Sequence, residues 1–340
     1  MSDSSNENLH LFLYDPNIPA AIVCCAAFGI SASLHLWACR YYKCFKLMWL
    51  HIFCTLMFTA GFALRAYLSF HHDWNQLNLN LYIASTSLIY MAPPLLELAN
   101  YHILGRVLYY VPYFSPIHPG RSLTTFGFLS AIVEALNAIG VSYTANRSLP
   151  EDRIKLGHIL MKASLICQIA IIALFCVFAI IFHRRCATGG IISRRVSTPL
   201  FALYASSVLI LARCIYRIVE HFTISSLESD PNADISPLLR HEWYFYVFEA
   251  AFMLVNSFLW NWKHPRRYLP ESSKTYLAQD GITEVEGPGW KDNRPFVATL
   301  LDPFGWFDSK GKHETPFWEK NGYMSVQNTA GDDPEQVPLR

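Results

Sequence analysis

The sequence predicts an all-α integral membrane protein, a bundle of seven transmembrane helices. Of its 340 residues, 52% are hydrophobic and only 16% are charged, whereas a soluble domain usually carries about 25% charged residues. The apolar residues gather in long blocks, and a helix that spans a bilayer needs about 20 mostly apolar residues. Seven blocks have this length: Ile18–Ala38, Leu47–Ser69, Leu79–His102, Leu123–Thr144, Ile159–Phe182, Pro199–Val219 and Trp243–Trp262.

The blocks define one membrane domain over residues 18–264, with a different composition on either side. Residues 1–17 are polar. Pro265 ends the last block, because proline lacks a backbone N–H and disfavours helix in the residue before it. The chain over 265–340 carries eight prolines and mixed charges without a sustained apolar period. We therefore expect a mostly disordered tail there.

Lysine and arginine in the loops predict the orientation, because cytoplasmic loops carry the excess of these residues. Residues 1–17 and the second loop have none. We therefore expect residues 1–17 outside and the tail in the cytosol. The positive residues assigned to the cytosolic side are Arg40, Lys43, Lys46, Arg106, Arg121, Arg184, Arg185, Arg194, Arg195, Lys263, Arg266 and Arg267.

The fourth loop is the exception, because it carries Arg147, Arg153 and Lys155 on the side assigned to the exterior. The same loop holds the sequon Asn146-Arg147-Ser148. A sequon can be glycosylated only on the luminal or extracellular side. We therefore expect Asn146 to be external and a glycosylation site.

The sixth block ends in "RCIYRIVEH", which carries Arg213, Arg217 and Glu220. Offsets of four and three residues place the three side chains on one face of a helix. A charge near the middle of a bilayer costs about 2.5–3.5 kcal/mol, so these residues require partners or water. We expect Arg217 and Glu220 to pair, and Glu249 of the next block to face them. The other charged residues of the blocks are Arg65, Glu97 and Glu134.

These charges have two interpretations, a substrate path through a polar interior or a fixed set of structural ion pairs. A third interpretation applies to Arg217 and Glu220, which could extend from the outer interface into water. Pro93 and Pro94 interrupt the third block one turn before Glu97. Two prolines predict a kink, which either lines a binding site or serves packing.

Several classes of protein are excluded or disfavoured. The net charge of +1 gives no field for binding nucleic acid. No nucleophile, base and metal set is visible, so we expect no enzyme, no metal site and no cofactor. The histidines are scattered and are interpreted as structural. None of the nine cysteines lies in a predicted external loop, so we expect no disulfide, although Cys39, Cys44 and Cys186 lie where palmitoylation occurs.

Four stretches resemble motifs of the fungal lipid-translocating exporter family, and the resemblance covers about residues 14–270. They are "GFALRAY", "MAPPLLELANYHILGRVL", "ARCIYRIVEH" and "HEWYFYVFEAAFM" with "KHP". Ser130 and Asn137 stand where the family has Asp and Gln, and Glu249 stands where it usually has Asp. The family's charged signature falls on Arg65, Arg213, Arg217, Glu220, Glu242 and Glu249, and Gln168 matches the family's glutamine in the fifth helix.

The resemblance implies export of amphipathic lipids, sphingoid-base-like or sterol-like, or of toxic amphiphiles, and hence resistance to them. The expected partners are membrane lipids and the amphiphile, and the expected location is the plasma membrane. The alternative is a seven-helix lipid sensor, receptor or regulator of lipid asymmetry, although "LGRVLYY" and "NSFLWNWKHP" lack receptor switch motifs. The candidate substrate-binding residues are Arg65, Glu97, Glu134, Gln168, Arg213, Arg217, Glu220, Glu242 and Glu249.

Overall fold

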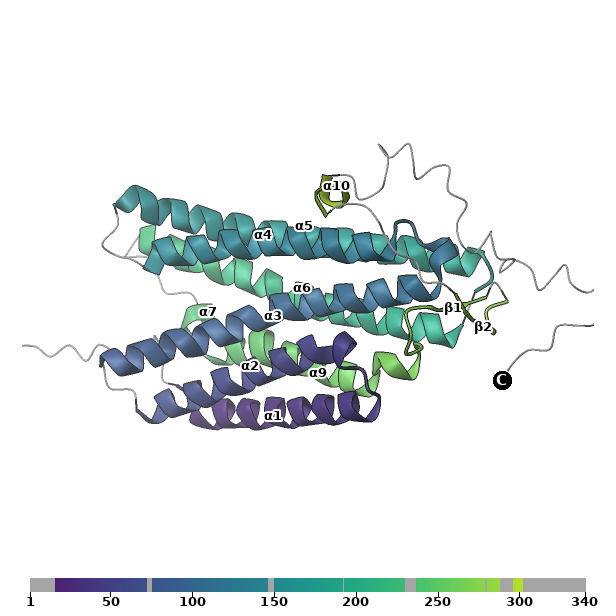
Figure 1. Cartoon of the computed structure of the whole chain (residues 1–340). Coiled ribbons are helices and arrows are strands. Elements are labelled where there is room, and N and C mark those ends of the chain that lie inside the picture. Colours follow the sequence, from purple (N-terminus) through teal and green to yellow (C-terminus); the bar gives the residue numbers. More distant parts are fainter. Residues whose placement is uncertain are drawn as a thin grey trace, which may run out of the picture.

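The computed structural model is an elongated bundle of long helices that run along its length (Figure 1). It describes residues 16–71, 75–145, 150–191, 193–229, 237–278, 280–287 and 296–301. Within these residues, six helices are long and apolar enough to cross a membrane. They are α1 (Ile18–Tyr41), α2 (Phe45–Phe70), α3 (Gln76–Tyr110), α4 (Pro119–Ala145), α5 (Glu151–Thr188) and α6 (Arg194–Ser229).

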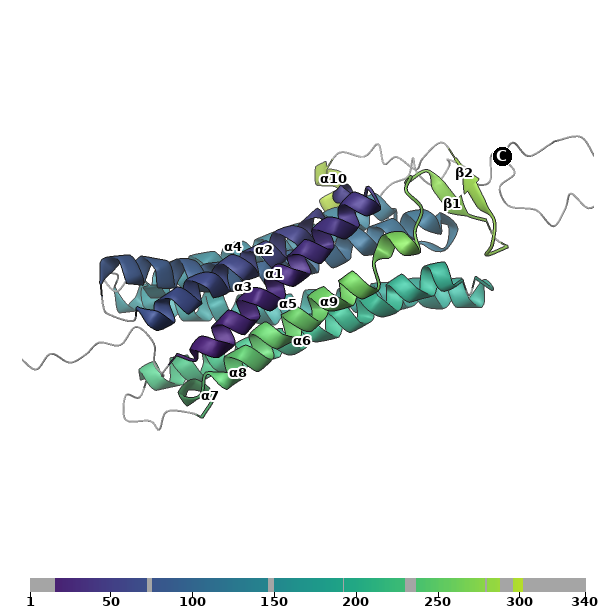
Figure 2. The ribbon, with the colours of Figure 1, turned by 90° about the horizontal axis from the view of Figure 1, so that it is seen from below.

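The seventh predicted block is helical throughout, but its hydrogen-bond pattern changes twice. A short α7 (Pro237–Arg240) precedes α8 (Trp243–Phe245), the π-helical turn η2 (Tyr246–Ala251) and α9 (Phe252–Trp262). A π turn widens the helix locally and is frequent at functional sites. The stretch lies beside α1 and α6 in Figure 2. Glu249 therefore enters the bundle from the widened turn.

Polar caps begin two of the long helices. The side chain of Asn17 accepts the backbone N–H of Ala20 at 3.0 Å at the start of α1. The side chain of Asn75 accepts the N–H of Asn78 at 2.7 Å at the start of α3. Each cap satisfies an N–H group that has no partner within the helix. These two helices begin at or within three residues of the predicted blocks, whereas α5 begins eight residues before its block.

Aromatic residues fill the core, and the outside of the bundle is apolar. Phe28 of α1 stacks on Phe58 of α2 at 4.5 Å between ring centroids, and Tyr101 of α3 packs on Phe175 of α5 at 4.7 Å. Large apolar side chains such as Trp37 remain exposed on the outer faces of the helices. An apolar surface of this extent suits contact with lipid. The fold is the predicted all-α membrane bundle.

Pro93 and Pro94 do not break α3, which continues from Gln76 to Tyr110 with both prolines inside it. Both rings are buried in the bundle. Their missing N–H groups leave carbonyls of the preceding turn without their usual partners. α3 is therefore not divided into two half-helices at the prolines, which lie one turn before Glu97.

The expected disorder after residue 265 is wrong for its first part. The chain forms the 3-10 turn η3 (Pro265–Arg267) and an antiparallel hairpin of β1 (Thr275–Leu277) and β2 (Glu284–Glu286). Tyr113 donates its hydroxyl to the carbonyl oxygen of Leu277 at 3.0 Å, and Arg195 pairs with Glu284. These long-range contacts order a segment that has no apolar period. The short helix α10 (Phe296–Leu301) packs on α4, and residues 302–340 lie outside the described residues.

Two glycines allow α4 and α5 to pack closely. A Cβ atom on Gly157 would lie 2.9 Å from the carbonyl oxygen of Gly140, and one on Gly140 would lie 2.6 Å from the Met161 Cγ atom. Small residues at a crossing let helix backbones approach, which is how membrane helices gain contact. No larger residue fits here unless the helices separate.

Replacing Gly157 with alanine is expected to destabilise the bundle by about 1–3 kcal/mol, because the added methyl group overfills a tight crossing. The measurement is the thermal unfolding of the purified protein in detergent. Gly29→Ala is the matched control, because its Cβ atom would meet only Thr59 Cγ2 at 3.7 Å. Equal unfolding temperatures for the two variants would contradict the close crossing.

Candidate functional site

Among the described residues, the most deeply buried ion pair joins Arg213 of α6 to Glu249 of η2. Arg213 donates to Glu249 Oε1 from Nη2 at 2.7 Å and from Nε at 2.8 Å. The two side chains are 4% and 0% exposed. The second carboxylate oxygen of Glu249 has no hydrogen-bond partner among the described residues. The structure confirms the expectation that Glu249 faces Arg213.

One helical turn further along α6, Arg217 pairs with Glu220 as the spacing predicts. Arg217 also contacts His221 at 3.1 Å and lies 3.8 Å from the ring centroid of Tyr90 on α3. A cation over an aromatic face is attracted by the ring's negative potential. The side chains of Arg217 and Glu220 are only 11% and 13% exposed. They therefore lie in the bundle and do not extend into the surroundings.

A third pair joins Arg65 of α2 to Glu242, which directly precedes α8. The Arg65 Nη2 atom lies 2.7 Å from Glu242 Oε1, and the backbone N–H of Asn17 donates to Glu242 Oε2 at 2.6 Å. The Arg65 guanidinium also lies 4.4 Å from the ring centroid of Phe245. This pair fastens α2 and α8 to the start of α1, and sequence reasoning did not predict it.

Glu97 of α3 is buried without an arginine partner among the described residues. It accepts the hydroxyl of Tyr101 and the side-chain N–H of Gln168 at 3.1 Å. The Tyr101 hydroxyl lies 3.2 Å from the hydroxyl of Ser130 on α4. Glu97 thus joins α3, α4 and α5 through neutral groups. Tyr101 follows Glu97 by four residues, a helical spacing that could have indicated this contact.

Glu134 of α4 is the other interior carboxyl group, and it is half-buried. The positive charge of Arg213 acts on both Glu134 and Glu97. Arg213 is already bound to Glu249, so its charge is shared among three carboxyl groups. Within the part of the chain that the structure describes, the interior therefore holds three arginines in pairs and two further acids without an arginine of their own. Such a carboxylate is stable in a low-dielectric site only with a proton or a cation nearby.

The predicted residues therefore form two groups. Arg65 and Glu242 form a contact of their own with the start of α1. The remaining seven residues lie on α3, α4, α5, α6 and η2 around Arg213, Arg217 and Glu97. The predicted glycosylation site Asn146 lies outside the described residues.

Long apolar helices, a lipid-facing surface and buried ion pairs define this chain as a multi-pass membrane protein with a charged interior. The family model described as "RTA1 like protein" matches residues 51–272. The chain therefore belongs to the RTA1-like family, which confirms the resemblance found in its motifs.

Three relatives carry names of transport proteins, not of enzymes. The chain is 46% identical over 302 residues to "Lipid-translocating exporter-like protein RTA1" of Leptosphaeria maculans. The matched region covers 86% of this chain and 58% of the relative. It is 30% identical over 246 residues to a protein of the same name from Ajellomyces capsulatus, covering 68% of this chain and 73% of the relative. It is 23% identical over 279 residues to "Probable lipid transporter atnI" of Emericella nidulans, covering 77% of this chain and 68% of the relative. The chain thus spans less than two thirds of the Leptosphaeria protein. No solved structure matches it.

Arg213→Ala is expected to lower the stability of the bundle by about 3–5 kcal/mol, because it leaves Glu249 buried without its counter-ion. Replacing both partners, Arg213→Met with Glu249→Met, should recover most of the loss because no charge remains unpaired. Thermal unfolding in detergent measures both effects. Lys155→Ala is the control, since its pair with Glu151 is 73% and 90% exposed. A double variant as unstable as Arg213→Ala would contradict this account.

Proposed function

We propose that this protein moves amphipathic lipids or toxic amphiphiles across a membrane and so confers resistance to them. The observation that carries the proposal is the pair of interior acids, Glu97 and Glu134, that have no arginine of their own. An amphiphile with an amine head group would supply the missing positive charge. Sphingoid-base-like molecules fit this description better than uncharged sterol-like ones.

The contacts of Glu97 suggest how the head group is held. The Tyr101 hydroxyl and the Gln168 amide already hold this carboxyl group in place. An ammonium group beside it would form charge-assisted hydrogen bonds, which are about twice as strong as neutral ones. The acyl or alkyl chain would lie among the apolar side chains.

The printed names of the relatives support transport as the class of function. Two are called lipid-translocating exporter-like proteins and one a probable lipid transporter. For this chain we propose export from the cell through the plasma membrane. The membrane domain over 18–264 would cross seven times, with the stretch from α8 to α9 as the seventh span. Residues 1–17 and Asn146 would lie outside and the chain after 265 in the cytosol.

A lipid sensor, receptor or regulator of lipid asymmetry is the second candidate. The observation that favours it is that all three interior arginines already have carboxylate partners. A closed set of ion pairs can hold helices in one arrangement and be broken by a ligand, as a switch requires. In that case binding of the amphiphile would change the arrangement of α6 without transport.

Glu97→Gln and Glu134→Gln are each expected to reduce export of a labelled sphingoid base by about 10- to 100-fold. The reason is the loss of a charge-assisted hydrogen bond of about 1.5–3 kcal/mol. The measurement is efflux from cells that express equal amounts of each protein at the membrane. Glu151→Gln is the control, since this residue is exposed at the start of α5. Unchanged efflux in both interior variants would contradict the proposed head-group site.

The swap of Arg217→Glu with Glu220→Arg separates transport from a structural role in the same assay. If these two residues only hold each other, the swap should restore much of what either single change loses. If they contact the substrate, the swapped protein should reach the membrane and remain inactive.

The proposed orientation predicts a glycan on Asn146 and a protected C-terminus. Asn146→Gln should abolish a glycosidase-sensitive shift on a gel, because the sequon is used only outside the cytosol. A tag after Arg340 should resist protease in intact cells and be digested after permeabilisation. Digestion of the tag in intact cells would contradict the orientation.

A further inference from the structure

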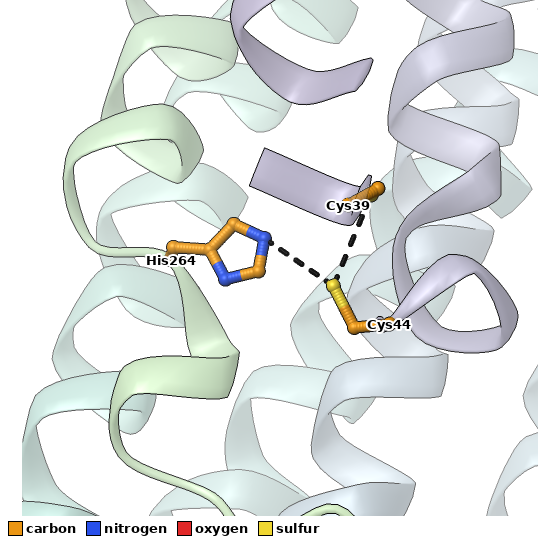
Figure 3. Close-up of side chains that lie close together, drawn as sticks. All are labelled: Cys39, Cys44 and His264. Carbon is orange, nitrogen blue, oxygen red and sulfur yellow. Dashed lines mark hydrogen bonds between the residues drawn. The ribbon is translucent and has the colours of Figure 1, made fainter. Parts of the chain in front are cut away.

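Three metal-binding side chains meet at one end of the bundle, away from the charged interior. They are Cys39 in the last turn of α1, Cys44 directly before α2, and His264 directly after the helix that ends with α9. Their thiol sulfurs and an imidazole nitrogen lie within 4.8 Å of one another. Figure 3 shows Cys44 between the other two. Sequence reasoning expected no metal site, since no set of ligands was visible. His264 is 220 residues from Cys44 along the chain.

The distances among these atoms suit a single zinc ion. The two sulfurs are 3.9 Å apart, and Cys44 Sγ lies 3.7 Å from His264 Nε2. Zinc bonds of about 2.3 Å to sulfur and about 2.0–2.1 Å to nitrogen place neighbouring tetrahedral ligands about 3.6–3.8 Å apart. A hydrogen bond between the two thiols would not by itself bring the His264 nitrogen within 3.7 Å of Cys44 Sγ. Two sides of the triangle are thus close to the size that the ion needs, and the third lies within 4.8 Å.

We propose that Cys39, Cys44 and His264 bind one Zn²⁺ ion, with a fourth position left for water. The ion replaces the two thiol protons and binds the neutral imidazole at Nε2. Zn²⁺ with two thiolates has no net charge, which suits a site at the edge of the bilayer. A singly charged ion such as Cu⁺ would leave a negative charge there. The imidazole proton then lies on Nδ1. This nitrogen therefore no longer accepts the backbone N–H of Arg266, which lies 3.3 Å away.

The surroundings hold the ligands in place. The ring of Tyr42 stacks on His264 at 5.1 Å between centroids, which fixes the plane of the imidazole. The Cys44 sulfur lies beside both the Cys39 sulfur and the His264 ring. Zinc binds thiolates and neutral imidazole, so both thiols release their protons when the ion binds.

An entry path for the ion lies beside Cys44. This residue lines a pocket of about 750 Å³ at the same end of the bundle. The other two ligands are 0% and 1% exposed, so the ion would enter past Cys44. Burial of this degree also disfavours the palmitoylation suggested by the position of Cys39 and Cys44 in the sequence, because an acyltransferase must reach the thiol.

A bound ion would fasten three separate elements, the end of α1, the start of α2 and the chain after α9. Residues 265–287, which carry η3 and the hairpin, begin directly at His264. Zinc would therefore stabilise the end of the bundle from which this segment folds back. This stabilisation of the fold by zinc does not depend on the proposed lipid transport.

The test uses the purified full-length protein in detergent, reduced and freed of metal. Co²⁺ is added as a spectroscopic probe, because its thiolate bonds give near-ultraviolet charge-transfer absorption and tetrahedral sites give intense visible bands. We expect one Co²⁺ per chain with both features, displaced by one equivalent of Zn²⁺. Cys39→Ser, Cys44→Ser and His264→Ala should each weaken Zn²⁺ binding by about 100-fold or more. Zn²⁺ should raise the unfolding temperature of the unaltered protein and leave that of the three ligand variants nearly unchanged.

The matched control is Cys186→Ser, which removes another buried cysteine that lies outside the cluster. It should bind Co²⁺ as the unaltered protein does. Absence of thiolate absorption in the folded, unaltered protein would overturn the proposal, whatever the folding of the variants. Absorption that persists in Cys44→Ser would overturn it too, because the metal would then be bound elsewhere.

Discussion

The buried pair of Arg213 and Glu249 is the interaction on which the arrangement of the bundle depends. Both side chains are almost fully enclosed, and neither charge is tolerable alone in a low-dielectric interior. α6 can therefore pack against the last helical stretch only in the register that joins the two groups. The π turn contributes to this arrangement, because it widens the helix at Glu249, the residue that reaches Arg213.

The same pairing sets what the interior can do. Among the described residues, Arg65, Arg213 and Arg217 each pair with a carboxylate. The carboxyl groups of Glu97 and Glu134, on α3 and α4, have no such pair. We propose that the ion pairs hold the helices and that the two acids receive the cation of the substrate.

Different side-chain contacts hold the helices together at the two ends of the bundle. At one end, Arg65 and Glu242 hold α2 and α8 against the start of α1. At the other, two thiols and an imidazole meet where α1, α2 and the chain after α9 converge (Figure 3). The hairpin after His264 lies at this second end in Figure 1. The segment that follows the membrane domain is thereby tied to the helices rather than independent of them.

The sequence by itself determined the helices, because the apolar blocks needed for a bilayer are a local property of the chain. It also placed Arg213, Arg217 and Glu220 on one face and paired the last two, since offsets of three and four residues suffice for that. Tertiary structure alone decided which distant residues meet. Arg65 and Glu242 are 177 residues apart, and Cys44 and His264 are 220 apart. The hairpin of β1 and β2 is held by Tyr113 of the segment after α3 and by Arg195 of α6. Such contacts leave no periodic pattern in the sequence, because they depend on how whole helices are placed and not on the residues beside them.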